Sequence, residues 1–171
     1  MRVLVAVGCH AQSTFEVADE IGDVLRRNLK ETHDNVEVDV RRAEDVDSVE
    51  GYDAAVIGSA VRRGRWLEPA RRLVETHAER LSRCPVWLFS ASAGGDALRP
   101  DAEPAEMALL LAATQARTHR VLGGALPFAQ PATGRRRQPQ PGAGHFRHWA
   151  EVEAWATVVS YELRGLMGAR R

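Results

Sequence analysis

The sequence predicts an α/β fold, in which a parallel sheet is covered by helices on both faces. Short apolar segments rich in β-branched residues alternate along the chain with longer segments whose apolar residues recur every three or four positions. The segments between successive strands are long enough to hold the crossover helices that parallel strands need. A chain of 171 residues fits one domain, whose core needs no disulfide or metal to fold.

Five segments are predicted to be strands. Four of them are short and apolar, and the second alternates valine with charged residues, which is typical of an edge strand. The predicted strands cover residues 2–7, 36–41, 53–59, 85–91 and 119–125.

Four helices are predicted, and three of them have a single apolar face. These faces are formed by Val17, Ile21, Val24 and Leu25 in residues 14–30, by Leu67, Ala70, Leu73 and Val74 in residues 67–82, and by Trp149, Val152, Trp155 and Val159 in residues 148–164. The remaining helix, residues 104–117, is apolar around most of its circumference and has Pro104 near its first turn.

One segment departs from this alternation. Residues 127–145 are rich in proline and glycine and contain the triplet Arg135, Arg136 and Arg137. Such a composition predicts an irregular Pro/Arg-rich loop within the single domain. We favour a solvated connection over a basic docking patch, because three adjacent arginines specify little.

Charge and cysteine content exclude several functional classes. Lys and Arg together number 23, as do Asp and Glu, so the chain lacks the broad basic face typical of proteins that bind nucleic acid. No apolar run approaches the roughly 20 residues of a membrane span, and no leader precedes the first strand, which predicts a cytoplasmic protein without a transmembrane segment. Cys9 and Cys84 lack the spacing of a metal site or a disulfide, and we expect two free thiols and no metal.

The strand count and the connections favour a flavodoxin-like three-layer sandwich with strands in the order 2-1-3-4-5. In this arrangement a ligand binds outside the carboxyl ends of the strands, at the switch point beside the first strand. Three loops then meet at one edge: residues 8–14, 60–66 and 92–103.

The first of these loops opens a helix with two hydroxyl side chains, Ser13 and Thr14. The first turn of a helix has unpaired N–H groups and the positive end of the helix dipole, so a phosphate is stabilised there. The alternative is that Ser13 or Thr14 serves only as an N-cap. Both interpretations remain open from the residues alone.

The other two loops supply the remaining candidate ligand contacts. Trp66 could stack on a planar ring, with arginines neutralising an anionic ligand, or it could pack in the core at the start of the next helix. The third loop offers backbone amides, which suit a ring edge and equally suit a plain turn. The second loop consists of Ala60, Val61, Arg62, Arg63, Gly64, Arg65 and Trp66, and the third includes Ser92, Ala93, Gly94, Gly95 and Asp96.

Most of the chain resembles the flavodoxin-domain proteins of the menaquinone-dependent protoporphyrinogen oxidase type. The matching segments are VLVAVGCHAQSTFEVADEI, GYDAAVIGSAVRRGRWLEPARRLVETHAERLSRCPVWLFSAS, HRVLGGAL and HFRHWAEVEAWA, in this order. The most specific of these is GYDAAVIGSAVRRGRW with the THAERL that follows it.

The resemblance implies noncovalent binding of FMN, with the isoalloxazine ring between residues 60–66 and 91–96. It also implies an oxidoreductase or electron-transfer function with a redox partner protein or a quinone, and it leaves open a homo-oligomer. The phosphate would lie in the loop formed by Cys9, His10, Ala11, Gln12, Ser13 and Thr14.

The phosphate loop departs from the family pattern at two positions. The family usually has Ser or Thr where this chain has Cys9, and glycine where it has Gln12, while Thr14 matches. The loss of a hydroxyl donor and of a glycine weakens phosphate binding. The alternative function is therefore a degenerate flavodoxin-like module that has lost FMN and acts in binding or regulation.

Overall fold

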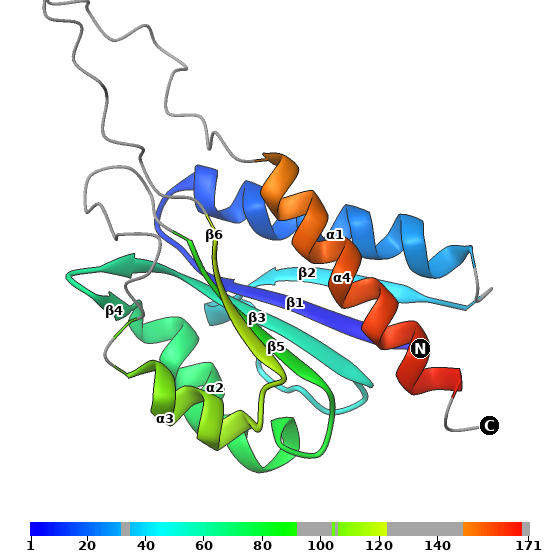
Figure 1. The fold of residues 1–171 in the computed structure, drawn as a ribbon. Coiled ribbons are helices and arrows are strands. Elements are labelled where there is room, and N and C mark those ends of the chain that lie inside the picture. Colours follow the sequence, from blue (N-terminus) through cyan, green and yellow to red (C-terminus); the bar gives the residue numbers. More distant parts are fainter. Residues whose placement is uncertain (32–34, 92–103, 105, 123–148, 169–171) are drawn as a thin grey trace, which may run out of the picture.

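The computed structural model describes residues 1–31, 35–91, 104, 106–122 and 149–168, which form one layered α/β unit (Figure 1). Its central sheet has the strand order β2-β1-β3-β5-β6, with every neighbouring pair parallel, and β4 pairs with β3 in the antiparallel sense. The strands are β1 (Arg2–Gly8), β2 (Glu37–Arg42), β3 (Ala54–Arg62), β4 (Arg65–Trp66), β5 (Val86–Ala91) and β6 (Thr118–Leu122). The predicted fold class and strand order are confirmed, because the five parallel strands follow the order 2-1-3-4-5 once the short β4 is set aside.

The helices cover both faces of the sheet (Figure 1). On one face α1 (Gln12–Lys30) lies beside α4 (Trp149–Gly168), and on the other lie α2 (Glu68–Leu81), α3 (Met107–Thr114) and the short 3-10 helix η1 (Ala43–Asp45). Alternate residues of β1 supply two separate cores: Val3 and Val5 pack toward α1 and α4, whereas Leu4 and Ala6 pack toward α2.

The boundaries of two elements differ from the prediction in ways that affect the site. The strand predicted over residues 53–59 continues to Arg62, since β4 pairs back onto it. The first helix begins at Gln12, two residues before the predicted start. Residues 127–145 lie outside the described part of the chain.

A charged cluster joins the edge strand β2 to the loop before β3. The Tyr52 hydroxyl donates to Asp39 Oδ2 at 2.7 Å, and Arg2 Nη2 donates to the same oxygen at 2.9 Å. The hydrogen bond from Tyr52 and the bond and charge of Arg2 lower the pKa of Asp39, against the opposing effect of partial burial. Ionised Asp39 therefore stabilises the folded state.

We expect Asp39→Asn to flatten the acid limb of the stability curve. A carboxyl with a depressed pKa stabilises the fold above its unfolded pKa of about 3.9, and this contribution is lost as the pH falls through the folded pKa. The wild type should therefore lose stability more steeply than Asp39→Asn below about pH 4. Urea unfolding at a series of pH values measures this, with the exposed Asp47 changed to Asn as the matched control. Equal acid slopes in Asp39→Asn and the wild type would contradict the assignment.

Candidate functional site

The carboxyl ends of three strands meet at one edge of the sheet. Gly8 at the end of β1 pairs with Ser59 of β3, and Ala60 of β3 pairs with Ala91 at the end of β5. The ends of β1 and β5 therefore lie at the same edge, where β3 continues into its hairpin. Residues 92–96 lie outside the described part of the chain.

The first loop leads directly into an uncapped helix. Ala11 is the N-cap of α1, with an extended backbone and no side-chain cap hydrogen bond, and the first turn contains no acidic residue. Ser13 and Thr14 therefore lie inside the first turn, and the alternative that one of them is the N-cap is wrong. No side chain competes at the N-cap for the first-turn amides, so the helix start suits an anion.

The two residues that depart from the family pattern occupy different environments in this loop. Cys9 is 3% exposed and packs in the core beside α1, whereas Gln12 is exposed at the first helical position. Burial raises the pKa of the Cys9 thiol, and the positive charge of Arg42 opposes this rise. Cys9 therefore remains a neutral thiol rather than a reactive thiolate at neutral pH.

Arg42 reaches the first loop from the end of β2, and it was not among the site residues predicted from the sequence. Its Nη1 donates to the carbonyl oxygen of Cys9 at 3.3 Å and to Cys9 Sγ at 3.2 Å, and its Cζ lies 5.0 Å from the centre of the Phe15 ring. The sequence contains one signal for it, because Arg42 directly follows residues 36–41, the strand predicted to neighbour the first strand. Arg42 pairs in register with Val7, just before the loop.

The second predicted loop is a tight hairpin instead of an open loop. Ala60, Val61 and Arg62 continue β3, Arg63 and Gly64 form the turn, and β4 returns. The turn residues have φ values of 52° and 73°, as a two-residue hairpin of the primed type requires. The prediction of an open loop over residues 60–66 is therefore wrong, because these residues form a β-hairpin. The turn was missed because arginine rarely adopts a positive φ, so Arg63 is not recognised as a turn residue from the sequence.

Glu106 fixes this hairpin from the segment that precedes α3. Its carboxylate accepts from the backbone N–H of Trp66 at 2.7 Å and from Arg65 Nε at 3.0 Å. The Glu106 side chain is only 11% exposed. Arg65 is therefore already paired with a carboxylate, and the hairpin exposes two further arginines, Arg62 and Arg63.

Trp66 is a core residue in this structure. It is 2% exposed, it packs with residues of β3, β5 and α2, and its Nε1 donates to Ser90 Oγ at 2.7 Å. Ser90 Oγ also lies 2.8 Å from His119 Nε2. Its burial therefore agrees with the second of the two alternatives, in which Trp66 packs in the core at the start of the next helix.

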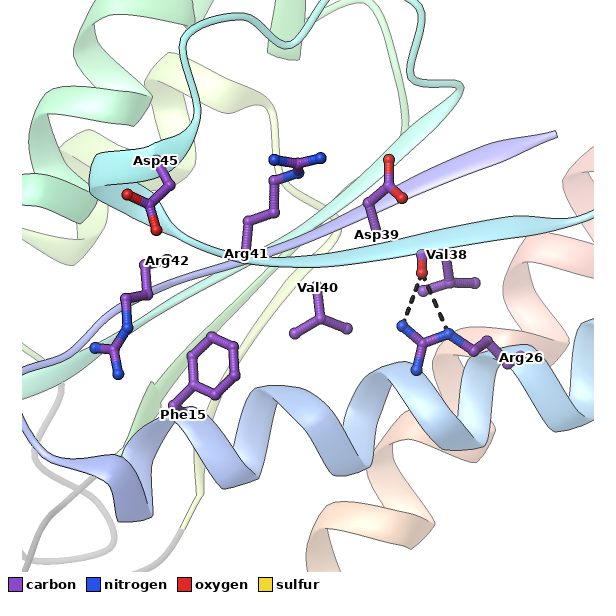
Figure 2. A pocket seen from close by; sticks show the side chains of 8 residues that line it. All are labelled: Phe15, Arg26, Val38, Asp39, Val40, Arg41, Arg42 and Asp45. Atoms are coloured by element: carbon purple, nitrogen blue, oxygen red, sulfur yellow. Dashed lines mark hydrogen bonds between the residues drawn. The ribbon is translucent and has the colours of Figure 1, made fainter.

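A groove runs between α1 and the edge strand β2, next to the first loop (Figure 2). Three of its lining residues are apolar and five are charged. Arg26 of α1 donates across to the Val38 carbonyl of β2 through Nε at 3.2 Å and Nη2 at 2.8 Å. None of the predicted site residues lines it. The lining residues are Phe15, Arg26, Val38, Asp39, Val40, Arg41, Arg42 and Asp45.

The described residues contain no cluster of three or more His, Cys, Asp or Glu side chains able to hold a metal ion. Both cysteines are free thiols, as predicted. None of the helices in the described ranges combines the length and apolar composition needed to cross a bilayer.

Comparison with known proteins places the chain among flavodoxin-like folds. The family model for the flavodoxin domain matches residues 4–137. No curated protein sequence matches the chain.

Several solved structures share the fold at low sequence identity. A flavodoxin from the domain Archaea is 14% identical with a TM-score of 0.61 over 96% of this chain and 99% of its own. A cysteine-to-serine mutant of flavodoxin from Pseudomonas aeruginosa is 14% identical with a TM-score of 0.63 over 96% and 99% of the two chains. The rubredoxin oxygen:oxidoreductase of Desulfovibrio gigas is 9% identical with a TM-score of 0.63, over 96% of this chain and 36% of that one.

Proposed function

Since the chain belongs to the flavodoxin domain family, we propose that it binds FMN at the carboxyl edge of its sheet and transfers electrons to or from a redox partner protein or a quinone. FMN supplies the redox chemistry when it is bound, and the protein binds and orients it. The finer activity, oxidation of protoporphyrinogen, rests on the sequence resemblance alone.

The uncapped start of α1 is the observation that carries this proposal. The residues from Cys9 to Ala11 lead directly into α1. The N-cap residue of this helix makes no side-chain hydrogen bond, and the first turn contains no carboxylate. A phosphate there accepts hydrogen bonds from first-turn amides and from the Ser13 hydroxyl, and it meets the positive end of the helix dipole. The residues present therefore fit the phosphate of FMN.

The ring would lie along the hairpin and the segment after β5. With Trp66 in the core, the residues that the hairpin would present to a ligand are Arg62 and Arg63, which are exposed, and Gly64 at its tip. Residues 92–96 would border the other side of the ring. Glu106 would keep the hairpin in place, since it bonds to the backbone of β4.

A second candidate is a binding or regulatory module that has lost FMN. Two observations favour it: the residue at the hydroxyl position is the buried Cys9, and the only aromatic residue of the hairpin is the buried Trp66. The two functions differ in whether the purified protein binds flavin.

We expect the purified full chain to bind FMN more tightly than riboflavin. Titration of the protein into each flavin, followed by the change in flavin fluorescence and absorbance, gives both dissociation constants. The phosphate contacts should favour FMN by about tenfold or more, because hydrogen bonds to a charged group contribute about 1.5 to 3 kcal/mol. A preparation that changes neither flavin signal at high protein concentration would overturn FMN binding and support the second candidate.

A further inference from the structure

We propose that Arg42 binds the phosphate of the flavin nucleotide, as a cationic contact that compensates for the altered phosphate loop. The inference rests on the proposed function and adds to it a residue outside the loop. It follows from the position of Arg42, from the restraints on its side chain and from its lack of a carboxylate partner within the described residues.

The position of Arg42 is set by the sheet. Because β2 and β1 pair in parallel with Arg42 opposite Val7, the end of β2 lies beside the point where β1 turns into the loop. Figure 2 shows the Arg42 side chain next to Phe15, at the end of the groove nearest the start of α1. Phe15 itself belongs to the first turns of α1.

Two contacts restrain the guanidinium at this place. Its Nη1 donates to the carbonyl oxygen of Cys9, and its Cζ lies over the Phe15 ring. A cation held over a ring and hydrogen-bonded to a backbone carbonyl loses little further side-chain entropy when it binds an anion. Arg42 is therefore oriented before any ligand arrives.

The charge of Arg42 is not balanced within the described fold. Arg26 pairs with Asp23 at 2.7 Å and Arg65 pairs with Glu106 at 3.0 Å, whereas no ion pair involves Arg42 among the residues that the structure describes. Within the same residues only its Nη1 donates a hydrogen bond, so Nε and Nη2 remain available to an acceptor. A half-buried arginine with free donors beside a helix start suits a phosphate ligand. Two phosphate oxygens can accept parallel hydrogen bonds from one guanidinium.

This contact would replace what the loop has lost. The side chain of Cys9 is a poorer donor than a hydroxyl, and Gln12 supplies no glycine for a close backbone approach. A guanidinium adds a full positive charge and up to two directed hydrogen bonds to the same ligand. Arg42 and the altered loop would therefore contact the same phosphate, with Arg42 replacing the donors that the loop lacks.

The experiment measures the ratio of riboflavin to FMN dissociation constants in the full chain and in three variants. We expect Arg42→Gln to lower this ratio by about tenfold to a hundredfold, as the loss of a charged contact predicts, while riboflavin affinity stays near the wild-type value. Arg42→Lys retains a charge and should recover part of the ratio. Arg41→Gln is the matched control on the same strand and should leave the ratio unchanged, since Arg41 has no contact with the first loop in the described structure.

The outcomes separate the two proposals. A wild type that binds neither flavin overturns the proposed function itself. A wild type that binds FMN while Arg42→Gln keeps the wild-type ratio overturns only the role of Arg42, as does an equal loss of FMN and riboflavin affinity. Thermal melts of all variants verify that the ratios are measured on folded protein, and Arg42→Lys carries the test if Arg42→Gln is unfolded.

Discussion

Replacement of Trp66 by alanine should lower the free energy of unfolding by about 3 to 5 kcal/mol, because it empties a large site in a closed core. The indole is 2% exposed and packs between the sheet and α2. The change also removes the donor that Ser90 Oγ accepts at 2.7 Å, which leaves a buried hydroxyl with one partner fewer. Urea unfolding measures the loss, and Trp149→Ala, at a tryptophan that is 38% exposed, should cost much less.

The variant Trp66→Phe separates the packing of the ring from its hydrogen bond. It retains an aromatic ring and loses only the indole N–H and part of the volume, so we expect a loss of about 1 to 3 kcal/mol. The same proteins titrated with FMN test the position of the residue. A Trp66→Ala protein that is nearly as stable as the wild type but binds FMN much more weakly would show that Trp66 contacts the ligand ring and does not stabilise the core.

The sequence predicted the sheet well because burial on both faces leaves a strong local signal. Strands such as residues 85–91 are apolar at nearly every position, and the valines of residues 36–41 alternate with charges because β2 lies at the edge. The end of β3 was harder to predict. Its extension to Arg62 depends on a turn that holds Arg63 at a φ of 52°, a conformation that arginine rarely favours by itself.

In the candidate site, too, only the features that depend on local sequence could be predicted. The helix start at residues 12–14 is a local feature, and it is visible in the order of apolar and polar residues. The roles of Arg42 and Glu106 depend on contacts with Cys9 and Trp66, which are distant in the sequence. Trp66 could not be assigned locally either, since an aromatic residue after a Gly-Arg pair fits both a ligand edge and a buried corner.

A methyl group added at Gly58 should destabilise the fold by about 3 kcal/mol, because the core has no space for it. Gly58 lies in the middle of β3 opposite Phe89 of β5, and a Cβ built there would lie 2.2 Å from Phe89 Cζ and 2.3 Å from Cε1. The ring cannot retreat easily, since Phe89 is fully buried and packs against Trp155 at a centroid distance of 5.9 Å. Gly58→Ala should therefore melt well below the wild type.

Two further variants test the cause of this loss. Gly165→Ala is the matched control, because a Cβ at Gly165 meets nothing within 4 Å and alanine favours the helix by about 1 kcal/mol, so stability should rise. Phe89→Leu in the Gly58→Ala background should relieve the overlap, so the double variant should be more stable than the sum of the two single losses predicts. Strict additivity of the two losses, or a Gly58→Ala protein as stable as the wild type, would show that overlap with Phe89 is not the reason why residue 58 must be glycine.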